Sequence, residues 1–429
     1  MAKKDSDSEH DAPHGGHEDH GGDSTAAVTD DVRLPGAARV AQIAGGVGVV
    51  GVLATIGLGV SAGDDLRSFS FAYLTAYVYG LSIALGALVW VTLQHLFAAR
   101  WSVVVRRVGE LFAASTPVMA LLALPILVPV LMGNHQLYEW VDHAAVEKDH
   151  ILHHKHAYLN ETFFAVRLVV YFVFWAWLGR YWLTKSVEQD RTKAKGLHAK
   201  LYGVSAPSMI ALALTLSFAA IDLIMSLDAR WFSTIFGVYY FSGAVVAWHS
   251  LFALVLFWLQ GQGKLVKSVS VHHFHDIGKM MFAFTVFWAY IAFSQYMLIW
   301  YANVPEETVW YQERTNGPWQ NVAWFLVVGH FVVPFLFLLS RHVKRNRAGL
   351  KLGAVWLLFV HWVDMFWLVK PSLGRHGELH GLPIGVMDVT AVVGVLGMLL
   401  AAAAWNARDK NLIPLEDERL AKSLAFTNS

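Results

Sequence analysis

The stretch HDIGKMMFAFTVFWAYIAFSQYMLIWYANVPEETVWY, residues 275–311, decides the fold class of this chain. Its middle, residues 277–300, is almost uncharged and, at a rise of about 1.5 Å per residue, long enough to cross a hydrocarbon core of about 30 Å. It also contains Ser294 and Gln295, whose hydrogen-bonding groups lipid cannot satisfy. We therefore expect a membrane helix in the interior of a helix bundle, with polar groups at both ends.

The composition of the whole chain agrees with this expectation. The 429 residues are 56% hydrophobic, and the mean hydropathy is +0.44, which is typical of an integral membrane protein. The formal net charge of +1 gives no electrostatic reason to expect nucleic acid as a partner. Because the chain has no cysteine, it excludes covalent c-type haem, thiolate-bound iron–sulfur clusters and cysteine-bound zinc within itself, and we expect no metal site.

Ten apolar segments follow one another along the chain, and most have the roughly 20 residues that a spanning helix needs. They lie near 37–61, 70–98, 108–132, 161–183, 205–227, 231–259, 277–300, 318–341, 350–370 and 384–406. The predicted fold is an all-α integral membrane protein with about ten transmembrane helices.

Outside this membrane domain, which we place at 37–406, the chain is polar. We expect residues 1–36 to form a flexible tail, and residues 407–429 a second tail with the amphipathic pattern of a helix that docks on a neighbour. Most lysines and arginines between the segments fall on the side of the N-terminus, so the positive-inside rule predicts that both termini are cytoplasmic.

A weak internal repeat is visible in the membrane domain. Asp222, in AAIDLIMS of the fifth segment, has a counterpart in Asp364, in HWVDMFWL of the ninth. Helices 2–5, within 70–227, and helices 6–9, within 231–370, would then form two four-helix bundles of the same orientation. Helices 1 and 10 would flank them.

One run in this domain resembles a known family. FAFTVFWAYIAFSQYMLIWYANVPEET, at 282–308, is similar to a helix and exit loop of the second large polytopic membrane subunit of alternative complex III. That complex is a bacterial quinol:electron-acceptor oxidoreductase, and the subunit is related to the polysulfide-reductase (NrfD-type) membrane family. The resemblance begins in YLN–FF–R at 158–167 and continues through DLIMSLDARWFSTIFGVYYFSG at 222–243. It fades in the first and last segments and in the tails.

The resemblance implies a subunit without metal cofactors in a respiratory complex of the bacterial inner membrane. The implied partners are a sister NrfD-like membrane subunit, an iron–sulfur subunit, c-type haem subunits, small membrane subunits and a terminal oxidase. Haem c and iron–sulfur clusters would lie on those partners, and quinol or menaquinol would be the substrate of the complex. By analogy, this chain would contribute a proton pathway and structural support beside the quinol-oxidising sister, and would not be catalytic alone. It could instead bind quinol itself near the outer face, or serve only as a scaffold.

Ionisable groups at membrane depth cost several kcal/mol unless they are paired or hydrated, so each is a functional candidate. Arg167 and Asp222 fall at the same depth on consecutive antiparallel helices, and we expect them to pair. In the resembled family, a His and an Asp near the outer face of the first bundle form the quinol site. Asp222 would stand for that Asp, and His143, in the loop at 133–160, is the nearest His. The alternative for the Arg167–Asp222 pair is an ion pair that only braces the two helices.

Further candidates predict a proton pathway through both bundles. His361 and Asp364 are three residues apart and share a helix face, and His330 falls at a comparable depth. A His–Asp pair can exchange protons near neutral pH. Together with Arg167 and Asp222, the predicted pathway includes His249, His330, His361, Asp364, Asp388, His95, Glu110, Asp276 and Lys279. The alternatives for single histidines are a hydrogen-bonded structural role or, for His330 with His361, haem ligation.

Overall fold

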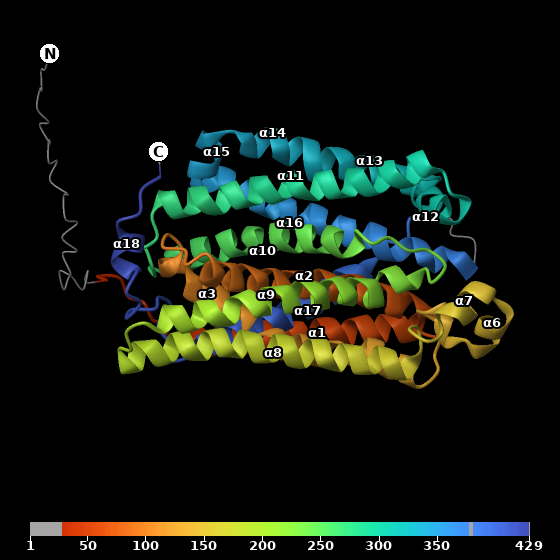
Figure 1. Ribbon diagram of the computed structural model, residues 1–429, viewed down its shortest axis with the longest axis horizontal. Coiled ribbons are helices and arrows are strands. Elements are labelled where there is room, and N and C mark those ends of the chain that lie inside the picture. The colour runs from red at the N-terminus through yellow and green to blue at the C-terminus, as the bar shows by residue number, and fades with distance from the viewer. Residues whose placement is uncertain (1–27, 377–380, 429) are drawn as a thin grey trace, which may run out of the picture.

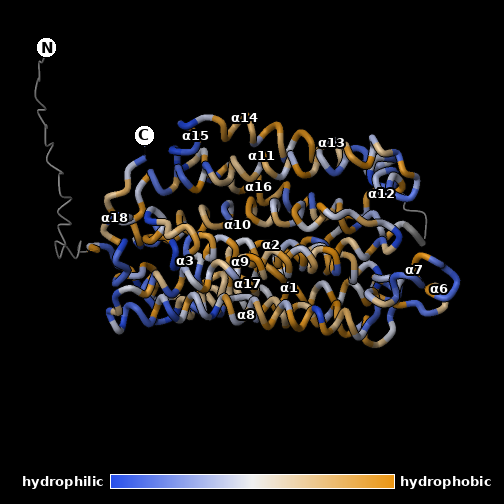
Figure 2. The backbone as a smooth tube through the Cα atoms, viewed as in Figure 1, coloured by the Kyte–Doolittle hydropathy of each residue, from blue (hydrophilic) through white to orange (hydrophobic). Residues whose placement is uncertain are grey.

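The structure is a computed structural model that describes residues 28–376 and 381–428. Its described residues form ten helices long and apolar enough to cross a membrane, and no strands. These spans are Ala37–Ala62, Arg67–Leu96, Val103–Leu131, Glu161–Thr192, Leu197–Leu227, Phe236–Gly261, Val271–Ala302, Pro318–Leu339, Arg347–Gly374 and Val386–Ala407. They run side by side, with an apolar middle and polar ends (Figures 1 and 2). The predicted all-α multi-pass membrane fold is confirmed.

Several spans are built from more than one helical piece. The uninterrupted helices are α1 (Ala37–Ala62), α2 (Arg67–Leu96), α8 (Glu161–Thr192), α10 (Phe236–Gly261), α11 (Val271–Ala302) and α17 (Val386–Ala407). The third span consists of α3 (Val103–Ala113), α4 (Thr116–Leu122) and α5 (Leu124–Leu131), and the fifth of α9 (Leu197–Leu223) and η2 (Met225–Leu227). The eighth consists of α13 (Pro318–Leu326), the π-helix η3 (Val327–Val332) and α14 (Val333–Leu339). The ninth consists of α16 (Arg347–Val369) and the start of η4 (Lys370–His376).

The shorter helices lie outside the spans. They are η1 (Glu139–Val141), α6 (His143–Lys148), α7 (His150–Lys155), α12 (Pro305–Thr315), α15 (Arg341–Arg345) and α18 (Leu420–Leu424). In the loop at 133–160, Asp142 and Asp149 each accept backbone N–H groups at the start of a short helix, α6 and α7.

The first bundle (spans 2–5) and the second bundle (spans 6–9) of the prediction pack closely on each other, since α10 contacts both α2 and α9. In the first bundle, α2 packs on α3 and α9, and α8 packs on α3, α4 and α9. In the second, α10 packs on α11 and α16, while α14 contacts α11 and α13 contacts α16. Because α2 also packs on α10 and α16, it connects the two bundles.

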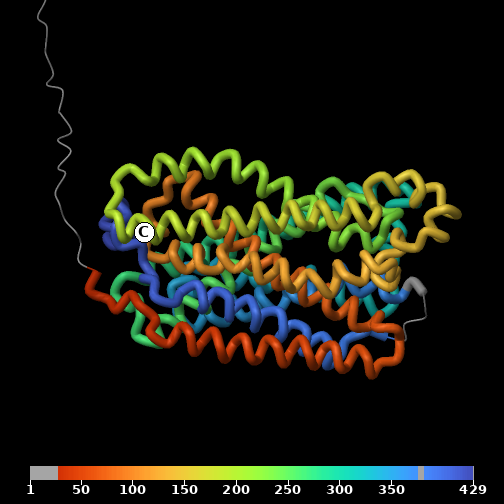
Figure 3. The backbone as a smooth tube through the Cα atoms, turned by 90° about the horizontal axis from the view of Figure 1, so that it is seen from below, coloured from red at the N-terminus to blue at the C-terminus, as the bar shows by residue number. Residues whose placement is uncertain are grey.

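The two flanking helices, α1 and α17, pack on each other along their length and then on α2 (Figure 3). Their backbones approach closely at glycines, since a Cβ on Gly51 would lie 2.6 Å from the nitrogen of Gly394. A Cβ on Gly397 would lie 2.7 Å from the Cα of Gly48. Helices 1 and 10 of the prediction therefore lie on the same side, as a pair.

The helix within 275–311 is not in the interior, so this part of the prediction is wrong. Only 28% of the apolar window of α11 is buried, against 100% for α2. Large side chains of α11, including Tyr290 and Phe293, are exposed where lipid would surround the protein. Gln295 is buried, as expected of its polar amide, and is satisfied by the hydroxyls of Ser233 and Tyr311.

The described parts of both tails dock at the same end of the helix bundle, against other segments of this chain. Asp30 accepts the backbone N–H groups of Lys267 and Ser268, and the backbone N–H of Leu412 donates to the carbonyl of Val32. In the C-terminal tail, the Asp417 carboxylate lies 2.7 Å from Nη2 of Arg106. Residues 28–36 are therefore not a free tail, and the described C-terminal segment docks on its own chain. The rest of the predicted N-terminal tail lies outside the described residues.

Candidate functional site

The first bundle contains the predicted ion pair. Arg167 donates from Nε and Nη2 to the two carboxylate oxygens of Asp222, both at 2.9 Å, and the Tyr171 hydroxyl donates to the same carboxylate at 2.9 Å. Asp222 is fully buried, and the guanidinium lies over the rings of Tyr158 and Phe163. The pairing is confirmed. Its bidentate geometry neutralises the carboxylate and braces α8 against α9.

His143 does not join this pair. Its side chain is 69% exposed and lies 3.3 Å from a carboxylate oxygen of Glu161. Among the described residues, no hydrogen bond or ion pair connects His143 to Asp222. The predicted quinone-binding group of Asp222, Arg167 and His143 is therefore not assembled at the outer face of the first bundle.

Asp364, the counterpart of Asp222 in the second bundle, has a different environment. It is fully buried, and it accepts hydrogen bonds from the Tyr239 hydroxyl and, at 3.1 Å, from the Trp288 indole N–H. No cation pairs with it in the described part of the chain, whereas the other four predicted acids are all paired. Those pairs are Asp222 with Arg167 at 2.9 Å, Asp388 with Lys370 at 2.7 Å, Asp276 with Lys279 at 2.5 Å, and Glu110 with Arg106 and Arg107, each at 3.0 Å.

Two buried histidines are linked to this carboxylate through Trp288 and through each other. The His330 ring stacks on Trp288, with the ring centroids 3.8 Å apart, and neither of its nitrogens has a hydrogen-bond partner among the described residues. His361 shares a 2.8 Å hydrogen bond between Nε2 and the hydroxyl of Ser82 on α2, and its ring is 6.4 Å from that of His330. The structure thus brings together Asp364, Tyr239, Trp288, His330 and His361, which we call the Asp364 cluster.

The histidines of the Asp364 cluster are not arranged to hold a haem between them. Bis-histidine ligation needs two ring nitrogens that point at one iron from opposite sides. Here the two rings meet edge to face at 62°, and Nε2 of His361 is already engaged by Ser82.

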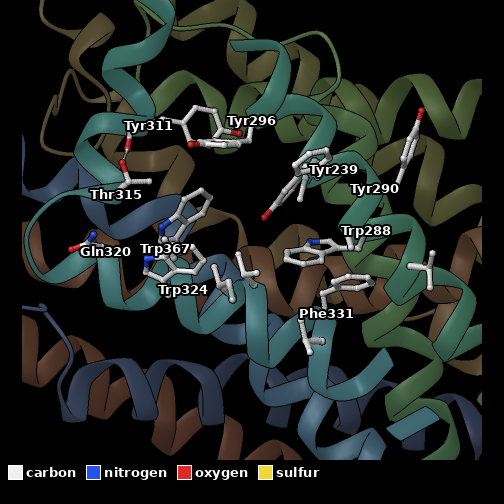
Figure 4. Close-up of a pocket in the computed structure, with 18 residues that line it drawn as sticks. Tyr239, Trp288, Tyr290, Tyr296, Tyr311, Thr315, Gln320, Trp324, Phe331 and Trp367 are labelled. Atoms are coloured by element: carbon white, nitrogen blue, oxygen red, sulfur yellow. Dashed lines mark hydrogen bonds between the residues drawn. The ribbon is translucent and has the colours of Figure 1, made fainter. Parts of the chain in front are cut away.

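A cavity of about 860 Å³ adjoins the Asp364 cluster, and we call it the Asp364 pocket. Tyr239 and Trp288, the two hydrogen-bond donors to Asp364, line it together with residues of α11, α12, α13 and η3. Figure 4 shows aromatic side chains on several sides of the cavity, with the Tyr239 hydroxyl directed into it. Several lining side chains, such as Tyr290 at 62% exposure, are also open to the membrane. The carboxyl group is therefore one hydrogen bond away from a lipid-accessible space.

The π-helix η3 shapes one wall of this pocket. Pro334 has no N–H to bond the carbonyl of His330, four residues earlier, and its ring would clash with that carbonyl in a regular α-helix. The chain widens at Val327–Val332 instead, and the Trp356 indole N–H donates to the carbonyl of Gly329 at 2.7 Å. The sequence analysis did not predict this distortion, although Pro334, four residues after His330, is a signal for it.

The predicted candidates His249 and His95 have hydrogen bonds and ring contacts that do not involve Asp364. His249 shares its Nδ1 with the carbonyl of Val245 at 2.8 Å, and its Nε2 has no partner among the described residues. His95 stacks on Trp182 at 4.7 Å, and in the described chain neither of its ring nitrogens is hydrogen-bonded. Direct side-chain hydrogen bonds therefore do not connect these histidines to Asp364.

Glu110 belongs to an ionic network at the end of the first bundle where the C-terminal tail docks. Its two guanidinium partners reach further acids, Arg106 to Asp417 at 2.7 Å and Arg107 to Asp190 at 3.0 Å. Burial raises the pKa of the Asp417 carboxyl, but the guanidiniums of Arg106 and Arg419 outweigh this effect and hold that pKa well below its usual range. This network clamps the C-terminal tail onto α3 and α8.

Comparison with known proteins gives no family assignment. The chain matches no protein-family model, and no curated protein matches it significantly.

Proposed function

We propose that this chain is a membrane subunit of a bacterial quinol-oxidising respiratory complex, in which Asp364 carries protons within the second bundle. The observation that carries the proposal is a fully buried carboxyl group without a cation partner among the described residues, hydrogen-bonded to a tyrosine at a lipid-accessible pocket. The similarity of residues 158–308 to the second polytopic subunit of alternative complex III supports the assignment to such a complex.

The physical argument rests on the cost of charge in an apolar environment. A carboxylate in a bidentate ion pair, such as Asp222, must break that pair before it can take up a proton. Asp364 has only two neutral donors, so it can gain or lose a proton while its neighbours stay in place. Histidine is the side chain best suited to pass protons near neutral pH, and His330 and His361 lie in the same cluster.

In this proposal, the electrons travel on partner subunits that hold iron–sulfur clusters and haem c. The chain spans the inner membrane with both termini on the cytoplasmic side, next to a sister NrfD-like subunit. Support for the common side of the termini comes from the docked tails, which meet through a bridge between Arg33 and Asn411.

Substitution of Asp364 tests the proposal in the intact complex. Asp364→Asn keeps the shape and removes the titratable group, and we expect quinol-dependent turnover and proton release to fall at least about tenfold. The matched control is Glu188→Gln, which neutralises a partly exposed acid paired with Lys185 and should leave both rates within about twofold. Parental turnover and proton release in Asp364→Asn would contradict the proton-carrying role.

A purely structural role is the second candidate, and the ion pairs favour it. The cationic partners of Asp222 and Asp388 lie on other helices, and the two arginines that pair with Glu110 also reach acids outside α3. If Asp364→Asn leaves turnover unchanged while loss of these pairs lowers only the amount of assembled complex, the chain is a scaffold.

A further inference from the structure

We propose that a second pocket, at one end of the second bundle, binds the phosphate group of an anionic membrane phospholipid. This pocket has a volume of about 210 Å³ and lies around Phe257, so we call it the Phe257 pocket. Residues of α10, α11 and α15, of the loop between α10 and α11, and of the start of α16 line it. The inference goes beyond the proposed function, because Asp364 lies roughly 25 Å further along α16 than Arg347, by the helical rise.

The position of the Phe257 pocket places it at the boundary of the membrane. Beside it, α10 ends at Gly261, α11 begins at Val271 and α16 begins at Arg347. Val266 and Val271 line the pocket and are 51% and 40% exposed, so apolar surface adjoins its charged groups. Figure 1 shows α15 at the same end of the bundle as α18. A lipid can therefore place its headgroup in the pocket and keep its acyl chains beside the spans.

The walls of the Phe257 pocket are cationic. Lys344, Arg345 and Arg347 line it, and no acidic side chain among the described residues does. Burial and then the ammonium of Lys279 lower the pKa of Lys344, which lies outside the spans, so this cation is in a positive environment that no carboxylate compensates. A phosphate group in the pocket would supply the missing negative charge.

The acids of the neighbouring segments are engaged by other groups. Asp276 lies 2.5 Å from the ammonium of Lys279, and Asp31 pairs with Lys264. Asp30 accepts backbone N–H groups of the loop between α10 and α11. Within the described chain, no ion pair joins these acids to the cations that line the pocket. Those cations therefore remain available to an anion from outside the chain.

A stack of two phenylalanines positions two cations without neutralising them. The rings of Phe257 and Phe274 are parallel within 3°, with their centroids 4.1 Å apart. The Arg347 guanidinium lies 5.4 Å from the centre of the Phe257 ring, and the Lys351 ammonium lies 5.2 Å from it. A ring face attracts a cation but leaves its charge and most of its N–H donors unused. Both side chains can therefore donate to phosphate oxygens.

Two helices also begin at the Phe257 pocket. Ser270 and Asn346 line it, and they are the N-cap residues of α11 and α16. The N-terminus of a helix carries a partial positive charge, so both dipoles favour an anion here. This contribution adds to that of the cationic side chains and has the same sign.

The size and charge of the pocket favour the headgroup of an anionic lipid. A volume of about 210 Å³ is below the roughly 300–1,000 Å³ typical of sites that enclose a whole small molecule. Basic pockets between transmembrane helices are known to bind anionic headgroups. Phosphatidylglycerol carries a net negative charge, whereas the choline of phosphatidylcholine would bring a further cation to the same walls. We therefore expect the pocket to prefer phosphatidylglycerol.

Native mass spectrometry of the full chain in detergent, titrated with phosphatidylglycerol, tests the inference. The parent should bind one lipid saturably, at least about tenfold more tightly than phosphatidylcholine with the same acyl chains. Arg347→Gln combined with Lys351→Gln removes the two cations on Phe257, both of them exposed, and should weaken phosphatidylglycerol binding at least about tenfold. The matched control is Arg191→Gln combined with Lys195→Gln, which removes two exposed cations between α8 and α9 and should bind within twofold of the parent.

Equal affinity of the parent for the two lipids would overturn the inference, and this measurement needs no variant. Parental affinity in the Arg347 and Lys351 double variant would also overturn it, as would an equal loss in the control, which would indicate a general effect of net charge. Inorganic phosphate at the concentration of the lipid should not displace it. Displacement would show that phosphate alone is sufficient, and the assignment to a membrane lipid would then be wrong.

Discussion

Asp222 and Asp364 occupy corresponding positions in the two bundles, yet their surroundings differ in the one feature that decides their chemistry. Arg167 donates two hydrogen bonds to Asp222, whereas Asp364 accepts hydrogen bonds from a tyrosine hydroxyl and an indole N–H. The first arrangement fixes a charge and braces two helices. The second leaves a carboxyl group that can change its protonation state, with the Asp364 pocket beside it. The corresponding carboxyl groups of the two bundles thus differ: Asp222 is held in an ion pair, and Asp364 has only neutral donors.

Removal of the Arg167 guanidinium from the first bundle should lower the free energy of unfolding more than the other changes considered. Arg167→Ala leaves the Asp222 carboxylate buried and uncompensated, and we expect the free energy of unfolding to fall by about 3–5 kcal/mol. Thermal unfolding of the purified chain in detergent measures the loss. Arg180→Ala, which removes an exposed arginine from the same helix, should stay within about 0.5 kcal/mol of the parent. The comparison is wrong if both substitutions have the same small effect.

Loss of the Tyr239 hydroxyl from the second bundle should lower the free energy of unfolding much less. Tyr239→Phe removes one neutral hydrogen bond to Asp364, and we expect a cost of about 1–2 kcal/mol. The same detergent unfolding measurement applies, with Tyr171→Phe as the matched control because its hydroxyl donates to the ion-paired Asp222. A cost in Tyr239→Phe as large as that of Arg167→Ala would mean that Asp364 is a brace as well.

A pH titration of the Asp417 carboxyl should have the smallest effect of the three on the stability of the chain. The pKa of Asp417 is lowered in the folded chain, so this carboxylate stabilises the fold above its unfolded pKa of about 3.9. That stabilisation is lost as the pH falls below this value toward the lower folded pKa. We expect the chain to lose about 1 kcal/mol more stability than Asp417→Asn between pH 6 and pH 3. Parallel pH profiles of the two proteins, measured by thermal unfolding, would show that the tail clamp does not depend on this charge.

The sequence was enough to predict features that depend on the residues of one helix or of consecutive helices. Ten spans follow from hydropathy, and the Arg167–Asp222 pair follows from equal depth on consecutive antiparallel helices. His330, His361 and Asp364 gather as their depths predicted.

Features that depend on which other helices surround a helix could not be predicted from the sequence. Lipid and a protein interior are both apolar, so hydropathy cannot tell the central α2 from the peripheral α11, and the more recognisable α11 was placed inside. The partner of each acid was equally hidden, because Lys370, which pairs with Asp388, looks like an outer-loop residue in sequence. The Asp364 pocket arises where α11, α12 and the distorted η3 fail to fill space, and no single segment encodes that gap.

The glycine contacts between α1 and α17 have a consequence for biogenesis. Eight other spans separate α1 from α17 in the sequence, so α1 meets its main partner, through Gly51 and Gly394, only after those spans have been made. Until then the glycine face of α1 lacks the helix on which it packs. A chain halted before α17 would therefore hold both bundles but lack the packing of α17 on α1 and α2.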